Sequence, residues 1–294
     1  FDKKTGKVLW KRDLVADFGA PLLNYGYGGS PIVYGNTIIL SVGRTQEGQR
    51  GSRQLDEEAK KEAEAEPKDQ TLVAFEQATG RVVWKQHDYP VSYPSPILIN
   101  FDGTQQLVAL MAQEIIGVNP DDGQLLWHHA FTPNGNTISS PVWDGKDLLF
   151  FSSAYECGSR ALRLVNKEGK TVPEELWYSR KLRIHHGNAI HLGDTVYASS
   201  GDFGPAFLMA MNLETGKRLW LERGFGKSNF IYADGKMIIL DEDGQLALAT
   251  VSPEGITIHA KCKVAEPYAW AAPTLVGKTL YVRDRKHIIA LDLG

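Results

Sequence analysis

The sequence lacks several features that would place it in a common class of protein. It has only two cysteines, Cys157 and Cys262, and neither belongs to a CxxC pair or a CxxCH haem-attachment motif. We expect two free thiols rather than a disulfide. Positive charge is not in excess, because 32 Lys and Arg stand against 35 Asp and Glu, for a formal net charge of −3. A general nucleic-acid binder needs a basic surface, so nucleic acid is not an expected partner.

Long apolar runs are also missing. No stretch approaches the roughly 18 consecutive apolar residues of a membrane-spanning helix, so the sequence predicts no transmembrane segment. The chain starts at Phe1, in the middle of a repeat, rather than at a methionine. We therefore expect an upstream segment that includes a signal peptide.

The chain contains an internal repeat instead. A Gly turn followed by an apolar stretch ending in Trp occurs at Gly6/Trp10, Gly80/Trp84, Gly123/Trp127 and Gly216/Trp220. Weaker copies pair Gly169 with Trp177 and Gly255 with His259, which takes the place of the Trp. We expect each Trp to pack against the neighbouring repeat, and each Gly to make the turn and leave room for the ring. The alternative is that one of these Trp rings is a ligand platform.

A second repeated pattern predicts β-hairpins. Short apolar stretches flank a tight turn of Gly with Asn or Asp, a turn that needs positive φ angles. The six copies start at Ser30, Ser95, Ser140, Asn188, Asn229 and Ala272. A third apolar stretch follows each hairpin, and the Gly–Trp repeat supplies a fourth. Four antiparallel strands every 40 to 50 residues or so are typical of a β-propeller blade.

We therefore predict an all-β fold, a β-propeller of six visible blades that forms a single domain over residues 1–294. The chain opens with a fourth strand that has no first three, and it closes with three strands that lack a fourth. We expect residues 7–10 to pair with residues 288–291 and close a six-bladed ring. The alternative is a parent protein with seven or eight blades. A charged insertion at residues 48–70 has the composition of a solvated helix, and no other helix is predicted.

The D/N-x-x-T-G-x-x-x-W pattern resembles the tryptophan-docking repeat of propellers of the pyrroloquinoline quinone (PQQ) type, over essentially the whole chain. That family includes quinoprotein alcohol dehydrogenases and the outer-membrane assembly lipoprotein BamB. The resemblance implies the fold and a periplasmic or secreted location, and it fits both enzymes and scaffolds. The dehydrogenases hold the quinone beside two adjacent cysteines and a Ca²⁺. Cys157 and Cys262 are far apart in the sequence, and no residue matches a calcium ligand by motif. No cofactor is predicted, and PQQ with calcium is the alternative.

The segment RIHHGN, residues 183–188, is the leading candidate for a functional site. Loops that link blades share one face of a propeller with loops that link strands two and three, and function usually lies on such loops. Arg183, His185, His186 and Asn188 precede the innermost strand of the fourth blade, and Asp202 lies in another loop of that blade. We expect them to meet at the channel mouth, where a His–Asp pair would be a general base, a metal site or a pH-sensitive contact. The alternative is that the histidines only bond loop backbone.

Other candidates lie on the same face. Tyr27 and Trp270 are aromatic residues outside the repeat pattern, which favours a ligand or partner contact. The turn at residues 282–287 carries Arg283, Arg285 and Lys286 and is an anion-binding candidate, although charged turns are common at sheet edges. The segment DEDG, residues 241–244, resembles part of a calcium loop but lacks its distal Glu, so we expect a hairpin turn. No metal site is predicted.

Together these features favour a non-enzymatic binding or scaffold protein whose loop face takes a protein or a small-molecule ligand. The alternative is a quinoprotein-like oxidoreductase or a metal-assisted hydrolase that uses the same face.

Overall fold

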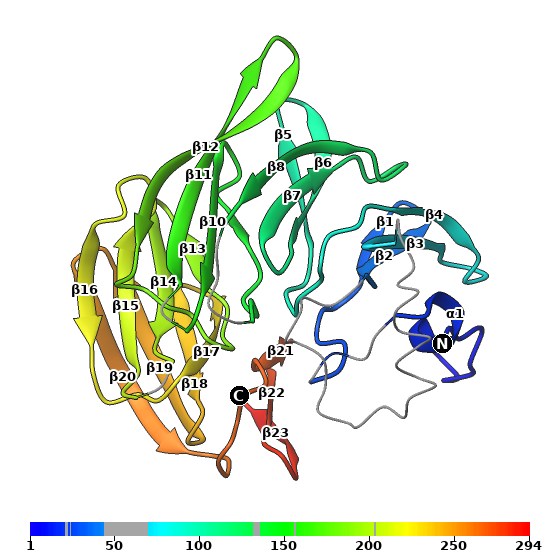
Figure 1. The fold of residues 1–294 in the computed structure, drawn as a ribbon. Helices are drawn as coiled ribbons and strands as arrows, with labels where there is room; N and C mark the ends of the chain where they lie inside the picture. Colours follow the sequence, from blue (N-terminus) through cyan, green and yellow to red (C-terminus); the bar gives the residue numbers. More distant parts are fainter. Residues whose placement is uncertain (21–22, 24, 44–69, 132–135, 156, 203) are drawn as a thin grey trace, which may run out of the picture. The chain divides into compact units, whose positions relative to one another are not determined.

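The computed structural model is built almost entirely of antiparallel β-strands (Figure 1). It describes residues 1–20, 23, 25–43, 70–131, 136–155, 157–202 and 204–294. The chain divides into two compact units. Unit 1 comprises Phe1–Thr132 with Asn166–Pro173, and unit 2 comprises Pro133–Val165 with Glu174–Gly294. Of the insertion expected at 48–70, all but Gln70 lies outside the described residues, so its helix stays a prediction, as does the single domain.

Unit 1 contains two four-stranded sheets with their strands in chain order. The first consists of β1 (Ile32–Tyr34), β2 (Thr37–Ser41), β3 (Leu72–Glu76) and β4 (Val82–Gln86). The second consists of β5 (Ile97–Phe101), β6 (Thr104–Leu110), β7 (Glu114–Val118) and β8 (Leu125–Ala130).

A short helix, α1 (Leu14–Phe18), precedes these sheets, so the prediction of no helix outside the insertion is wrong here. The side chain of Asp13 caps the helix by accepting hydrogen bonds from the N–H groups of Val15 and Ala16. Gly19 ends it in the left-handed conformation, with φ of 58°. Five residues are too few to show a helical period, so only these two caps could have predicted α1.

Unit 2 contains three further four-stranded sheets and one sheet of three strands among the described residues. The third sheet consists of β9 (Val142–Trp143), β10 (Leu148–Ser153), β11 (Gly158–Lys167) and β12 (Lys170–Ser179). The fourth consists of β13 (Ile190–Leu192), β14 (Thr195–Ser200), β15 (Phe207–Asn212) and β16 (Arg218–Glu222). The fifth consists of β17 (Ser228–Ala233), β18 (Lys236–Asp241), β19 (Gln245–Ser252) and β20 (Gly255–Lys263). The last consists of β21 (Thr274–Val276), β22 (Thr279–Arg283) and β23 (Ile288–Asp292).

All six predicted hairpins are present, each as the first two strands of a sheet. Ala233 pairs with Lys236 across a two-residue turn in which Asp234 and Gly235 have φ angles of 49° and 69°. Two consecutive positive φ angles define the type I′ turn, whose twist matches that of the flanking strands. The Asp–Gly pair is therefore the local cause of this hairpin.

In unit 2 the core lies in layers between successive sheets. One cluster joins side chains of the third and fourth sheets, including Phe150, Val196 and Met211. A second joins the fourth and fifth sheets, including Tyr197, Ala210 and Ile239. A third joins the fifth and last sheets, including Leu240, Leu280 and Val282. Because the inner strands are covered on both faces, their sequences are continuous apolar runs. The loops that connect the strands lie at the two ends of the sheets.

Three repeat Trp rings lie where the sequence predicts them, over the Gly of the next turn. A Cβ atom added to Gly216 would lie 2.6 Å from the ring of Trp177, and only glycine leaves that space. The indole of Trp177 also donates a hydrogen bond to the carbonyl oxygen of Leu213 at 2.8 Å. The same arrangement recurs for Trp10 over Gly80 and for Trp84 over Gly123.

The other copies of the repeat depart from this arrangement. Trp220 donates to the carbonyl oxygen of Ser252 at 2.8 Å but does not crowd Gly255. Trp127 donates to Gln106 Oε1, in its own sheet, at 2.6 Å. His259 is exposed, and its Nε2 lies 2.7 Å from the hydroxyl of Thr250. The repeat is therefore regular in sequence and less regular in its contacts.

The two ends of the chain do not test the predicted closure. Residues 7–10 belong to no strand, and β23 pairs with β22 alone among the described residues. The pairing of residues 7–10 with residues 288–291 stays a prediction. Cys157 is buried and Cys262 is exposed, and both are free, as expected. In the described part of the chain, no helix is long and apolar enough to cross a membrane.

Candidate functional site

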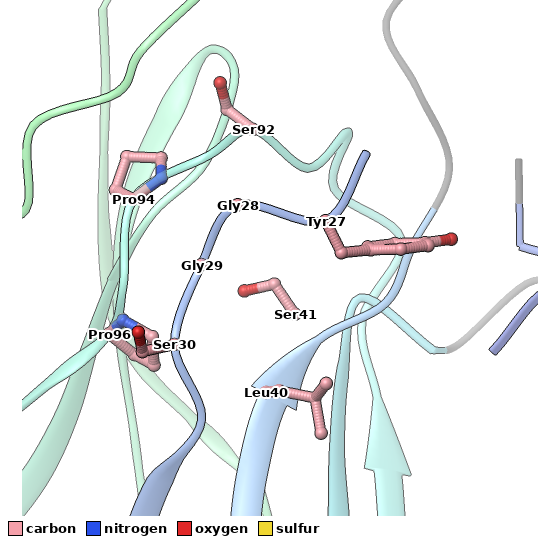
Figure 2. A pocket seen from close by; sticks show the side chains of 9 residues that line it. All are labelled: Tyr27, Gly28, Gly29, Ser30, Leu40, Ser41, Ser92, Pro94 and Pro96. Atoms are coloured by element: carbon pink, nitrogen blue, oxygen red, sulfur yellow. The ribbon is translucent and has the colours of Figure 1, made fainter. Parts of the chain in front are cut away.

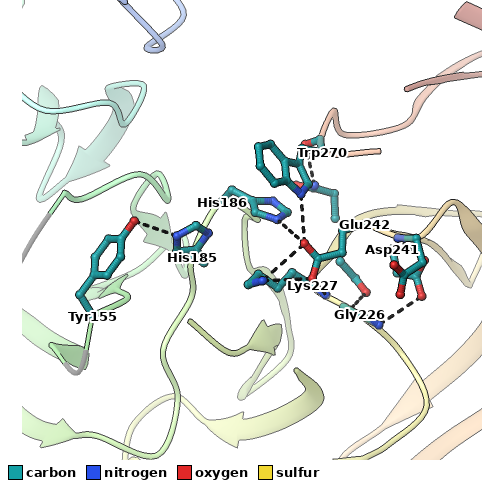
Figure 3. Close-up of polar contacts among 11 residues, drawn as sticks. Tyr155, His185, His186, Gly226, Lys227, Asp241, Glu242 and Trp270 are labelled. Atoms are coloured by element: carbon teal, nitrogen blue, oxygen red, sulfur yellow. Dashed lines mark hydrogen bonds and ion pairs between the residues drawn. The ribbon is translucent and has the colours of Figure 1, made fainter. Parts of the chain in front are cut away.

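Three loops between sheets and one turn within a sheet carry the candidate site, all in unit 2. The loop from β12 to β13 carries His185 and His186, the loop from β16 to β17 carries Lys227, and the loop from β20 to β21 carries Trp270. The turn between β18 and β19 carries Glu242. These five residues, which we name the His–Trp cluster, meet as shown in Figure 3. Blade-linking loops and turns between strands two and three therefore share one face of unit 2, as predicted.

Glu242 is the centre of the His–Trp cluster. Its Oε2 accepts a hydrogen bond from Trp270 Nε1 at 3.1 Å, and its Oε1 accepts one from Lys227 Nζ at 3.1 Å. The backbone N–H of Lys227 donates to the same Oε1 at 3.3 Å. Burial alone would raise the pKa of Glu242, but these hydrogen bonds outweigh it and the pKa is lowered. Glu242 is therefore a carboxylate at neutral pH.

The turn that holds Glu242 is fixed by the preceding residue. Asp241 is buried, and its carboxylate accepts hydrogen bonds from the backbone N–H groups of Gln245, at 2.9 Å, and of Gly226, at 3.2 Å. These bonds tie the β18–β19 turn to the loop before β17 (Figure 3). DEDG is thus a hairpin turn, as the sequence predicts, and its first Asp binds backbone N–H groups.

His186 is packed between ring systems and beside a carboxylate. Its ring centroid lies 5.2 Å from that of Trp270 and 5.5 Å from that of His185. Its Nε2 lies 3.9 Å from Glu242 Oε2, within ion-pair range but beyond a hydrogen bond. Neither ring nitrogen has a hydrogen-bond partner in the described part of the chain. Burial, followed by the neighbouring His185, lowers the pKa of His186 to about 4, so the ring is neutral at pH 7.

His185 is held from the opposite side. Its Nε2 lies 2.9 Å from the hydroxyl oxygen of Tyr155, and the two rings meet edge to face. Tyr155 itself has a left-handed backbone with φ of 54°, which is uncommon for a residue other than glycine. Burial, followed by the charge of Lys227, lowers the pKa of His185. Both histidines are therefore neutral rings in a partly buried site.

Asp202, the predicted partner of the histidines, acts on His185 through its charge, which opposes the lowering of the histidine's pKa. Its carboxylate forms an ion pair with Arg183, at 3.3 Å from Oδ2 to Nη1. The carboxylate beside His186 is Glu242, which comes from the next sheet and was expected only to form part of the DEDG hairpin turn. Asn188 is exposed, and its side-chain oxygen accepts a hydrogen bond from the backbone N–H of Ser140 at 3.2 Å. RIHHGN thus contributes two rings to the cluster, whereas Arg183 and Asn188 support the loops.

Trp270 connects the His–Trp cluster to an exposed aromatic surface. The ring centroid of Tyr268 lies 5.2 Å from that of Trp270, and the guanidinium of Arg285 lies 4.7 Å and 5.4 Å from the two centroids. Trp270 and Tyr268 remain 45% and 46% exposed. We name these three residues the aromatic–Arg surface. Of the two arginines in the anion-binding turn chosen from the sequence, Arg283 ends β22 as an exposed side chain, and Arg285 reaches the rings.

Tyr27, another candidate from the sequence, belongs to unit 1. It borders a cavity of about 10 Å³ between the loop before β1 and the loop before β5 (Figure 2), which is room for a single water at most. Burial, followed by the charge of Asp13, raises the pKa of its hydroxyl to about 12. Tyr27 also packs against the core that contains Phe75. These contacts are those of a partly buried structural tyrosine.

The described residues offer no calcium site of the kind that a quinone of this fold family would need, and the absence of a cofactor stays a prediction. Calcium takes six to eight oxygen ligands or so, several of them carboxylates. No group of three or more His, Cys, Asp or Glu side chains suited to a metal occurs within the described ranges. One free cysteine is buried and the other is exposed. What the cluster does offer is flat aromatic faces, a fixed carboxylate and a cation, which is the chemistry of recognition.

The sequence analysis missed Lys227 and Tyr155. It considered Glu242 only as part of the DEDG turn and Arg285 only as one of several charges in an anion-binding turn. A usable signal existed for Glu242 and Arg285. Each directly follows an Asp in a turn between strands two and three of its sheet, on the face already chosen for the histidines. Lys227 and Tyr155 have no such signal, because their roles depend on the path of their loops.

Comparison with known proteins supports the fold. A family model described as "Outer membrane protein assembly factor BamB" matches residues 1–222, and no curated protein matches the chain. The quinohemoprotein alcohol dehydrogenase from Comamonas testosteroni aligns over 94% of this chain and 53% of its own, at 11% identity and a TM-score of 0.61. BamB from Moraxella catarrhalis aligns over 76% of this chain and 79% of its own, at 15% identity and a TM-score of 0.44.

The family match ends at Glu222, the last residue of β16, so it includes the two histidines but not Lys227, Glu242, Trp270 or Arg285. The likeness to the dehydrogenase is a likeness of fold, and this chain spans about half of that protein. Because the family model covers most of the chain, the chain belongs to the BamB family and has the fold of a PQQ-like β-propeller.

Proposed function

We propose that this protein is a binding or scaffold protein that recognises a partner protein through the loops of unit 2. The observation that carries the proposal is the aromatic–Arg surface, where Trp270 and Tyr268 are a little under half exposed and held from behind. Trp, Tyr and Arg are the residue types that dominate the binding energy of protein interfaces. Side chains that are already ordered lose little conformational entropy on binding.

The contacts behind Trp270 explain why its ring is held in place. Its indole N–H donates to Glu242, its backbone carbonyl accepts a hydrogen bond from Asn229 at 2.9 Å, and one part of its ring packs on His186. Removing the ring therefore removes a fixed contact area and leaves the rest of the loop attached. This makes Trp270→Ala a clean test of recognition.

The cellular setting of this role is also a proposal. The matching family is described as an outer-membrane assembly factor, and its members include a protein of the bacterial outer-membrane assembly system. A location outside the cytoplasm and a protein ligand both agree with that description. The partner would be met at the loop face rather than at the Lys-, Glu- and Thr-rich turns at the opposite ends of the strands.

Site-specific photo-cross-linking in the native cells tests the proposal. A photoreactive phenylalanine replaces Tyr268, and the control replaces Tyr178, which is 44% exposed and also lies beneath an arginine. We expect an adduct of defined mass from position 268 that disappears when Trp270→Ala is added, and none from position 178. The adduct partner is then purified, and its Kd is measured against wild type and Trp270→Ala.

The opposite results are equally clear. Adducts of the same kind from both positions, or no adduct from position 268, would contradict a partner-binding surface. An alcohol-oxidising activity in the purified protein would favour the alternative function, an oxidoreductase.

A further inference from the structure

Arg285 is held in one orientation by its own turn and by two rings. The turn follows Asp284, whose buried carboxylate accepts backbone hydrogen bonds from Lys286 at 2.7 Å and from His287 at 2.6 Å. A third bond, from the backbone N–H of Glu266 at 3.1 Å, ties this turn to the loop that carries Tyr268 and Trp270. The guanidinium then lies over both of those rings. Its orientation is therefore set before any ligand arrives.

The charge of Arg285 is not neutralised in the structure. It has no ion pair and donates no hydrogen bond to any of the described residues. The nearby carboxylates are already committed, because Asp284 accepts three backbone hydrogen bonds and Glu242 binds Lys227 and Trp270. Backbone hydrogen bonds also hold the pKa of Asp284 well below its usual range, so this carboxylate stays ionised and bound to its own turn.

A second stacked arginine in unit 2 shows the contrast. Arg160 lies over the ring of Tyr178, with 4.2 Å from its guanidinium carbon to the ring centroid, and forms an ion pair with Glu175 at 3.3 Å. That arginine has its anion within the protein. Arg285 lies over two aromatic rings instead of one, and it forms no ion pair with a described carboxylate.

We infer that the aromatic–Arg surface is a receptor for a carboxylate side chain on an extended, acidic segment of the partner protein. Arg285 lies over the rings without donating a hydrogen bond to any described residue, so its N–H groups are available, and a guanidinium can bind a carboxylate with two parallel hydrogen bonds. Trp270 and Tyr268 then accept an apolar or aromatic side chain next to the acidic residue. This inference rests on the proposed function and names the chemistry that the surface recognises.

Three probes test the receptor on the intact chain. They are the capped peptide acetyl-Gly-Asp-Phe-Asp-Gly-amide, its counterpart with Asn in place of both Asp residues, and inorganic phosphate. The readout is the NMR shift of the Trp270 indole N–H, assigned by its loss in Trp270→Phe. We expect the Asp peptide to half-saturate the shift at a concentration at least tenfold lower than the Asn peptide, and phosphate to bind more weakly than the Asp peptide.

Two variants locate the effect. Arg285→Gln should erase the difference in affinity between the Asp and Asn peptides. Arg285→Lys should retain only part of it, because lysine keeps the charge but cannot bind a carboxylate through two parallel hydrogen bonds. Arg283→Gln is the matched control, since it removes the same charge two positions earlier, and it should leave the difference intact. Equal loss in both Gln variants would mean that net charge alone attracts the peptide, and the inference would fail.

The remaining outcomes separate this inference from the proposed function. If the Asp and Asn peptides bind alike, or if phosphate binds more tightly, the surface is not a carboxylate receptor. If a cross-linked partner binds with unchanged Kd to Arg285→Gln, the binding function stands and the receptor does not. If the Asp peptide binds as expected but position 268 captures no partner, the receptor stands and the proposed function falls.

Discussion

His186 shows how one side chain can be neutral and yet depend on its charged neighbours. The groups that face it are His185, Lys227 and Glu242, and the Lys227–Glu242 pair is already satisfied without it. Protonating His186 would place a second cation, after Lys227, beside one carboxylate in a partly buried site. The cost of that charge makes the cluster sensitive to acid.

Acidification should therefore weaken the folded state through His186. An unfolded histidine has a pKa of about 6.5, and burial lowers that of His186 to about 4 in the folded protein. Between these values the unfolded chain binds a proton that the folded chain excludes, so the free energy of unfolding falls as the pH decreases through this window. The full loss is of the order of 3 kcal/mol.

Urea denaturation at pH 7 and pH 5 measures this effect. We expect His186→Phe to reduce the difference between the two midpoints, whereas His191→Phe, a control on β13, should keep it. A His186→Phe variant whose stability falls with acid as steeply as the wild type would contradict the assignment.

The histidine pair and Trp270 could be chosen from the sequence because they are unusual residues in predicted loops. Their carboxylate partner could not. Asp202 is nearer to the histidines in the sequence and belongs to the same sheet, but it is bound to Arg183, and Glu242 reaches the site from the neighbouring sheet. Contacts between loops of adjacent sheets depend on sheet twist and loop path, which repeat spacing does not encode.

At the scale of the elements, the contact between a Trp ring and the Gly of the next turn occurs three times, at Gly80, Gly123 and Gly216. A glycine in such a turn can be required for its left-handed backbone or for the space that it leaves, and Gly216 and Gly235 distinguish these two requirements. Both have left-handed backbones, with φ of 65° and 69°, but an added Cβ would crowd the ring of Trp177 at Gly216 and meets open space at Gly235. The first glycine is needed for conformation and for space, and the second for conformation alone.

We expect Gly216→Ala to destabilise the fold more than Gly235→Ala. Both variants carry the strain of a left-handed alanine, roughly 1–2 kcal/mol. Gly216→Ala adds a clash with a packed ring, a further loss of about 1–3 kcal/mol. Thermal and urea unfolding of the two variants measure the difference. Equal losses would show that the ring does not need the space that Gly216 leaves.

Trp220→Ala tests the ring itself. Deleting a large aromatic side chain from a packed site costs about 3–5 kcal/mol, and here the indole hydrogen bond to Ser252 is lost as well. His259→Ala, at the equivalent position of the next repeat, should cost much less because His259 is exposed. Urea denaturation of both variants gives the comparison, and a Trp220→Ala variant as stable as wild type would rule out a packing role.

Hairpins and strand order could be predicted because glycine turns and apolar runs are local signals. The helix α1 and the contact of Trp127 could not. The helix is a single turn without a period, and Trp127 donates to Gln106 of its own sheet because that amide lies within reach. In both cases a short local contact decides the structure, and it leaves little trace in a pattern of residue types.

For the whole molecule, ring closure is the central prediction that remains. The register of β3 with β4 places Phe75 opposite Val82, and the same register would place Leu291 opposite Val8. Val8, outside any strand, is 51% exposed, and Ile288 in β23 is 75% exposed, as expected of segments that lack a pairing partner. The sequence counts the blades well because each carries its own signals, but closure depends on how distant parts meet.

Engineered cysteines test this closure in a chain with Cys157→Ala and Cys262→Ser. We expect Val8→Cys with Leu291→Cys to form an intramolecular disulfide on mild oxidation, detected by peptide mass. The control pair, Val8→Cys with Val276→Cys, uses the opposite edge strand of the last sheet and should remain reduced. A disulfide in the control alone, or only between molecules, would favour a parent with more blades.

A quinone cofactor can also be tested on the whole protein. We expect PQQ added with Ca²⁺ to show no tight binding, because within the described ranges no group of His, Cys, Asp and Glu suits a metal, and the two cysteines lie in different environments. Isothermal titration calorimetry measures this directly. Binding in the micromolar range or tighter would contradict the prediction and favour the oxidoreductase.

The direction of the Trp contacts has a consequence for biosynthesis. Each of the four rings that bond the next turn reaches forward along the chain, over 67 residues for Trp10, 36 for Trp84, 36 for Trp177 and 32 for Trp220. At roughly 5–20 residues per second, a new ring remains uncovered for several seconds until its turn emerges from the ribosome. Trp10 waits longest, so the nascent chain is most exposed to chaperones and to misassembly while the segment between Trp10 and Gln77 is being made.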